Sequence, residues 1–84
     1  MFEGYLIFRS VTGGQRGKAA LDRRGLRCAL GRSPRQLAPG GCAYALTVRR
    51  ADLAAAMDIL EKERAEPQNV FLRMPDGSYE RVSG

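Results

Sequence analysis

The sequence predicts an α+β domain of ferredoxin-like topology, in which an antiparallel sheet carries two helices on one face. Short apolar runs and two helical patterns follow one another in the order strand, helix, strand, strand, helix, strand, and one further strand completes the chain. The second helical pattern has apolar residues at i, i+3, i+4 and i+7. A turn sequence separates the last two apolar runs, which predicts a closing hairpin.

Length and composition indicate one small domain, residues 1–84. A chain of this size buries only about 60–65% of its unfolded surface, so the core is modest. Its hydrophobic fraction of 44% and charged fraction of 27% are typical of a folded globular protein. No apolar run approaches the roughly 18 residues that cross a bilayer, and the first residues lack the pattern of a secretory signal. We therefore expect a cytoplasmic protein without membrane contact.

The beginning of the chain predicts a strand and a helix. Residues 5–9 are a short apolar run typical of a central strand. Thr12 followed by Gln15 is a capping-box pattern, and Gly25 is the residue type that commonly ends a helix. We therefore expect the first helix at residues 13–24.

The remaining elements follow from alternation and helical spacing. Apolar residues alternate with others in a second strand, which turns three side chains toward the core: Leu26, Cys28 and Leu30. A third strand is expected at residues 42–48, and the second helix at residues 51–66, where Pro67 ends it. Residues 70–74 and 79–82 form the hairpin.

The predicted topology brings the start of the third strand beside the end of the first. The first two strands run the same way through a right-handed helical crossover, and the third returns antiparallel between them. This arrangement brings Cys42 toward the turn at residues 10–14, which is also the positive end of the first helix. The open face of the sheet stays free of helices.

Cys42 is the candidate functional residue. Prolines stiffen the preceding segment, and Gly41 allows a sharp turn, so we expect the thiol at a loop-to-strand junction. A helix N-terminus and a nearby cation, either Arg35 or Arg32, would lower its pKa and favour the thiolate. The helix contributes its first residues: Thr12, Gly13 and Gly14. A small apolar residue that closes a hairpin is the alternative role for Cys42.

The two cysteines do not predict a metal site. No histidine is present, so the chain lacks the ligands of a usual zinc site, and free thiols are expected. Cys28 alternates with core leucines, which favours a structural role. Formation of a disulfide with Cys42 stays an alternative for Cys28.

Two short segments carry a resemblance to a known family: Pro34-Arg35-Gln36-Leu37 and Gly41-Cys42-Ala43-Tyr44-Ala45-Leu46. With the strands around them they resemble the small bacterial Se/S carrier protein-like domains over roughly residues 5–60. The family's usual pattern is a strand, a Pro-Arg pair, a short spacer and a Ser/Gly-Cys-Gly step. Here Ala43 replaces the glycine after the cysteine.

The resemblance implies a carrier that holds sulfur or selenium as a persulfide or selenopersulfide. By motif position Cys42 is the carrying thiol, and Arg35 is the loop cation. Such a carrier takes the chalcogen from a donor like a cysteine desulfurase and passes it to an acceptor protein. It needs no cofactor. Because no histidine is available for a Cys-His pair, we expect a non-catalytic carrier rather than a stand-alone enzyme.

Two other classes of function stay open. The formal net charge is +5, which suits either a solvated surface or a nucleic-acid partner, and the same order of elements occurs in RNA-recognition sheets. Residues 41–48 hold one aromatic where such a strand has two or three, so we expect weak, unspecific nucleic-acid binding at most. A structural or regulatory subunit, with the open face used for contacts in a homodimer, is the third class.

Overall fold

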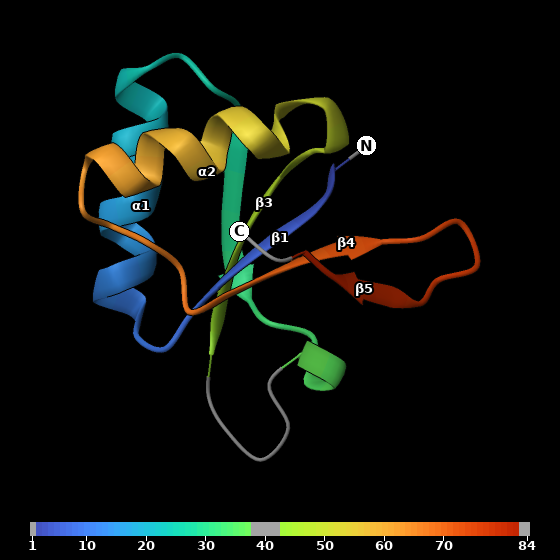
Figure 1. Ribbon diagram of the computed structural model, residues 1–84. Coiled ribbons are helices and arrows are strands. Elements are labelled where there is room, and N and C mark those ends of the chain that lie inside the picture. The colour runs from blue at the N-terminus through green and yellow to red at the C-terminus, as the bar shows by residue number, and fades with distance from the viewer. Residues whose placement is uncertain (1, 38–42, 83–84) are drawn as a thin grey trace.

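The computed structural model, which describes residues 2–37 and 43–82, confirms an α+β fold with two helices and a five-stranded antiparallel sheet (Figure 1). The elements in chain order are β1 (Phe2–Phe8), α1 (Val11–Arg23), β2 (Cys28–Arg32), η1 (Arg35–Leu37), β3 (Tyr44–Arg49), η2 (Arg50–Asp52), α2 (Leu53–Lys62), β4 (Asn69–Arg73) and β5 (Tyr79–Arg81). This order fits the ferredoxin-like topology with one extra strand. The short 3-10 turns η1 and η2 are additions that the sequence patterns did not predict.

The strands lie in the order β2-β3-β1-β4-β5. β3 pairs antiparallel with both β1 and β2, so it returns between them as predicted. Phe8, the last residue of β1, pairs with Tyr44, the first residue of β3. The predicted neighbourhood of the first strand's end and the third strand's start is therefore confirmed for the described residues.

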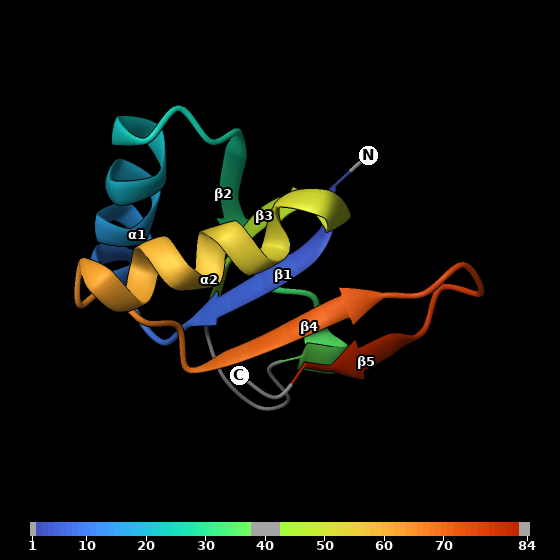
Figure 2. The ribbon, with the colours of Figure 1, turned by 45° about the horizontal axis from the view of Figure 1, so that its top comes forward.

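The core lies between the sheet and the two helices, which cover the same face (Figure 2). Alternate residues of β1, β3 and β4 point toward the helices, as the period of two requires. The buried members of this cluster are Leu6, Phe8, Ala20, Leu21, Leu46, Val48, Leu53, Ala56, Leu60 and Val70. Leu46 at the centre is fully buried.

Small residues let α1 lie close to the sheet. A Cβ added at Gly17 would come within 2.9 Å of both Leu46 Cδ1 and Phe8 Cζ. A Cβ at Gly14 would come within 2.8 Å of Leu30 Cδ1. A side chain at either position would force these neighbouring side chains to shift, which is harder at Gly17, because Leu46 and Phe8 are buried, than at Gly14, where Leu30 is only partly buried.

The opposite face of the sheet, called the open face below, is covered in part by η1. Leu37 of η1 packs on Ile7 and Ala45, and all three are buried. Partly buried aromatic side chains surround this small cluster: Tyr5, Phe71 and Tyr79. The rings of Tyr5 and Tyr79 meet edge to face, with centroids 5.3 Å apart and an interplanar angle of 89°.

The first helix starts earlier than the capping box predicted. It begins at Val11, and the cap is Ser10, whose Oγ accepts a hydrogen bond from Gly13 N at 3.0 Å. Thr12, the predicted cap, lies inside the helix, because Ser10 has the extended backbone that an N-cap needs. The other end follows the prediction: Gly25 adopts φ +73°, and the N–H groups of Gly25 and Leu26 donate to the carbonyls of Asp22 and Leu21.

The second helix is shorter than the prediction of residues 51–66. It ends at Lys62, and Ala65 N donates to Leu60 O across a turn in which Arg64 adopts φ +56°. This is the same type of helix end as at Gly25, built here with a non-glycine residue. The helix thus ends five residues before Pro67, and the residues just before the proline form neither helix nor strand, so the proline is not what stops the helix.

Candidate functional site

Cys42 and Gly41, the two predicted site residues of the motif, lie outside the described residues. The described chain reaches Leu37 at the end of η1 and resumes at Ala43. Ser33 N donates a hydrogen bond to Ala43 O at 3.0 Å, so the pairing of β2 and β3 continues up to the point where the description resumes. Ser33 and Ala43 are therefore neighbours at this end of the sheet.

The first turn of α1 lies beside the start of β3. Gly13 N is satisfied by Ser10 Oγ, and Gly14 N donates to Ser10 O at 3.1 Å. A Cβ added at Gly14 would lie 3.7 Å from Tyr44 Cβ, which places the positive end of the helix beside the beginning of β3. The first turn contains no acidic residue, so no carboxylate of its own balances the helix dipole there.

The structure separates Arg35 from the first turn of α1. Arg35 is exposed on η1, and η1 packs through Leu37 on the open face, whereas α1 covers the other face. The first turn of α1 contains three consecutive site residues, Thr12, Gly13 and Gly14, which are therefore close together. Among the described residues, the structure therefore brings the helix residues to the start of β3 and places Arg35 on the opposite side of the sheet.

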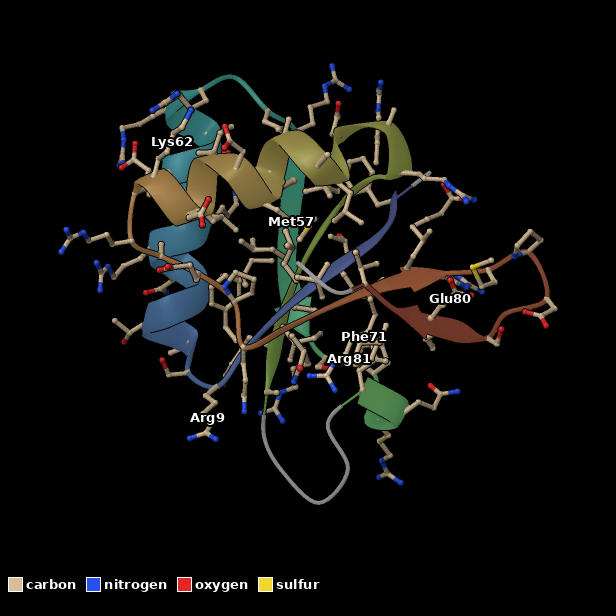
Figure 3. The ribbon with its side chains drawn as sticks, in the orientation of Figure 1. Arg9, Met57, Lys62, Phe71, Glu80 and Arg81 are labelled. Atoms are coloured by element: carbon tan, nitrogen blue, oxygen red, sulfur yellow. The ribbon has the colours of Figure 1, made fainter. Side chains whose placement is uncertain are left out.

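Two other arginines lie at this end of the molecule on the helix side. Arg32 pairs with Tyr44 across β2 and β3, and by alternation it shares the face of Leu30. Arg9 follows β1 directly, and Figure 3 shows it near the start of α1, pointing away from the sheet. From the sequence, Arg32 was predicted only as the alternative to Arg35, and Arg9 was not predicted. The register between β2 and β3 is what places Arg32 on the helix side of the sheet.

Cys28 has surroundings that oppose ionisation. It pairs with Val48 near the far end of β3 and is half-buried against the main core. Its Sγ donates a weak hydrogen bond of 3.8 Å to Asp22 Oδ1. Burial, and then the negative charge of Asp22, raise the pKa of the Cys28 thiol, and Lys18 opposes this only in part. Cys28 is therefore held as a neutral thiol near pH 7.

The strand prediction for Cys28 is confirmed, with a qualification on burial. Its side chain is on the helix-facing side of β2, as the alternation indicated. It is not enclosed in the core, because β2 is an edge strand and Cys28 lines an open hollow with Asp22 and Arg27. The polar environment comes from α1, whose last turns reach over this strand.

Over the described residues, no three side chains of the histidine, cysteine, aspartate or glutamate type gather as ligands for a metal ion. In the same part of the chain, neither helix has both the length and the apolar character needed to cross a membrane.

The fold and the described part of the site define a small ferredoxin-like α+β domain in which the N-terminus of α1 lies beside the start of β3. The chain belongs to the family described as "Putative Se/S carrier protein-like", whose model matches residues 3–72 of its 84 residues. No curated protein and no solved structure shows significant similarity to it. The resemblance seen in the two short motifs is thus confirmed across most of the chain.

Proposed function

We propose that this protein is a cytoplasmic sulfur or selenium carrier, with Cys42 as the carrying thiol. The observation that supports it is the family match, which includes Cys42 and both motif segments. Partners of a carrier are a donor protein of the cysteine desulfurase type and an acceptor protein. The proposed role of Arg35, Thr12, Gly13, Gly14 and Gly41 is to stabilise the thiolate or the terminal chalcogen.

The proposed transfer is an exchange in which no net oxidation takes place. The Cys42 thiolate attacks the terminal sulfur of a donor persulfide, a new S–S bond forms on Cys42, and the donor S–S bond breaks. The donor leaves as a thiolate, and the terminal sulfur, with its proton if it carries one, stays on Cys42. A nucleophile of the acceptor repeats the exchange and returns Cys42 to the thiolate. A terminal selenium is transferred in the same way.

The environment of Cys28 supports the assignment of the thiol to Cys42. A nucleophilic cysteine has to be a thiolate, and burial together with Asp22 raises the pKa of Cys28. The helix that supplies Asp22 begins, at its other end, beside the start of β3. Of the two cysteines, Cys28 thus faces a carboxylate at the C-terminal end of α1, where the helix dipole also disfavours an anion.

The test is an intact-mass measurement after incubation with a cysteine desulfurase, cysteine and no other thiol. We expect a gain of one or more sulfur atoms in the wild type and in Cys28→Ser, and none in Cys42→Ser. Cys28→Ser is a mild control, because a serine hydroxyl can also donate to Asp22. Sulfur uptake by Cys42→Ser, or its absence from the folded wild type with several donors, would overturn the proposal.

A second measurement assigns the activating cation. The alkylation rate of Cys42 as a function of pH gives its pKa in the wild type, Arg35→Gln and Arg32→Gln. An activating arginine should shift the curve toward about 8.5 when it is removed. A shift in Arg32→Gln with none in Arg35→Gln would assign the role to the arginine on the helix side of the sheet. A shift in Arg35→Gln alone would support the motif assignment.

A further inference from the structure

Aromatic and arginine side chains are neighbours across the open face of the sheet. Tyr5 of β1 pairs with Phe71 of β4, and Phe71 pairs in turn with Arg81 of β5. Next to this row, Arg73 of β4 pairs with Tyr79 of β5. Side chains of directly paired residues are on the same face, so three rings and two guanidinium groups share one patch. Figure 3 shows Phe71 and Arg81 side by side on the hairpin strands.

The geometry of this patch leaves its rings partly exposed. All three aromatic residues are half-buried, and Leu37 supports them from one side. Arg81 Nη2 donates to Asn69 Oδ1 at 2.7 Å, which holds its guanidinium group against the beginning of β4. Glu3 lies beside Arg73 at one corner and offsets part of this charge.

The third strand alone carries too few aromatic residues for base stacking. β3 does place a single aromatic in the described structure, Tyr44, and its side chain faces α1 rather than the open face. The topology instead gathers aromatics from β1, β4 and β5 on one surface. A stacking surface assembled from three strands is not visible from any one stretch of sequence.

We propose that the open face binds single-stranded nucleic acid. Unpaired bases stack on exposed aromatic rings whatever their sequence, and arginines at the ring edges attract the phosphates. In a duplex the bases are stacked on one another and cannot stack on the aromatic rings, so only the phosphate charges of a duplex can interact with the patch. A symmetric contact with a second copy through this face would bring the arginines of both copies together. The binding is therefore tolerant of sequence and steeply dependent on salt, and it does not involve the cysteine.

The experiment measures fluorescence anisotropy of labelled 12-nucleotide oligouridine, oligothymidine and a duplex of the same length. Binding of either single strand at least about tenfold tighter than the duplex is expected. Tyr79→Leu and Phe71→Leu should each weaken binding roughly tenfold by removing a stacking ring, since one stacked base contributes about 1–3 kcal/mol. Leucine keeps the apolar packing around Leu37. Arg73→Gln with Arg81→Gln should lower the slope of log affinity against log salt by about 0.7 for each lost contact.

Matched variants on the other side of the molecule control for general effects. Tyr44→Leu removes a ring from the helix-facing side, and Arg9→Gln with Arg16→Gln removes the same charge from exposed positions near α1. Neither should change affinity by more than about twofold, and circular dichroism checks that each variant is folded. Equal loss in the control pair and the open-face pair, unchanged binding in both leucine variants, or duplex binding as tight as single-strand binding would overturn the proposal. Cys42→Ser should bind like the wild type, so this outcome is independent of the carrier function.

Discussion

The two faces of the sheet are covered by different amounts of protein. Among the described residues, α1 and α2 cover the helix-facing side, and ten buried residues form its cluster. In the same part of the chain, the buried cluster of the open face has three members, Ile7, Ala45 and Leu37, of which Leu37 belongs to the short turn η1. Two full helices thus supply most of the hydrophobic stabilisation, and the thin cover leaves polar and aromatic groups of the open face available for binding.

The two faces differ in how well they tolerate a change of side chain. On the helix side, close packing makes the cost of altering a side chain depend on volume, because neighbours cannot move far. On the open face, η1 packs through one buried side chain in the described part of the chain, Leu37, so neighbouring side chains can relax after a substitution.

The largest expected difference is between two leucine truncations. Leu46→Ala removes a fully buried side chain from the centre of the helix-facing cluster and should lower the free energy of unfolding by about 3–4 kcal/mol. Leu37→Ala, on the open face, should cost only about 1–2 kcal/mol, because η1 can settle onto the space it leaves. Urea denaturation measures both. Equal losses would mean that η1 is as rigid a cover as the helices.

Two glycines test the same contrast in the opposite direction, by adding a methyl group. Gly17→Ala should destabilise by about 1–2 kcal/mol, because the crowding against Leu46 and Phe8 exceeds the gain in helix propensity. Gly31, in β2, has nothing within 4 Å of an added Cβ. Gly31→Ala should therefore stay within about 0.5 kcal/mol of the wild type. Thermal unfolding of the two single variants is sufficient, and a stable Gly17→Ala protein would contradict the close approach of α1.

Within the helix layer, the two helix ends form a smaller matched pair. Arg64 adopts the left-handed conformation at the end of α2 that Gly25 adopts at the end of α1. Arg64→Gly should stabilise the fold by about 0.5–1 kcal/mol, and Gly25→Ala should destabilise it by a similar amount. Arg64→Ala is the control for the loss of the side chain, and it should not stabilise. A loss of stability in Arg64→Gly would show that the arginine side chain matters more than the strain.

The smallest effect is a dependence on alkaline pH that differs between the faces. Burial raises the pKa of Cys28 on the helix side, and burial next to Tyr5 raises that of Tyr79 on the open face. A raised pKa in the folded state means that the unfolded chain loses its proton first. Each contribution is therefore complete below the group's ordinary pKa and is lost as pH rises through the folded value. Cys28→Ser should remove the earlier decline, from about pH 8.5, and Tyr79→Phe the later one, from about pH 10.

The fold could be predicted further from the sequence than the site could. Alternation at Leu26, Cys28 and Leu30 and the turn signal at Gly25 act locally, so they identified β2 and the end of α1 before any contact was known. Thr12 was the wrong cap because Ser10 is also a residue type that caps helices, and only the extended backbone of Ser10 decides between the two. The end of α2 was missed because Arg64 adopts a conformation for which its residue type gives no signal.

The position of Arg35 relative to the sheet depends on which face of the sheet its loop packs against. The sequence gives Arg35 a place near Cys42 along the chain but no side of the sheet. Arg35 lies on the open face because Leu37, two residues later, packs on Ile7 and Ala45. This contact joins distant segments of the chain, so no local sequence pattern predicts it. The aromatic patch of the open face was missed for the same reason, because its members come from three strands.

The central position of β1 has a consequence for how the chain acquires its structure. β1 is the first strand of the chain, and it pairs with β3 on one side and with β4, near the other end of the chain, on the other. Its partners therefore emerge late during synthesis, and closing the sheet requires contacts of high sequence separation, which slows folding relative to a helical bundle of equal size. Until β4 arrives, an edge of β1 is open to pairing with other chains. Variants that delay the β4–β5 hairpin should therefore aggregate during expression even where the finished fold would be stable.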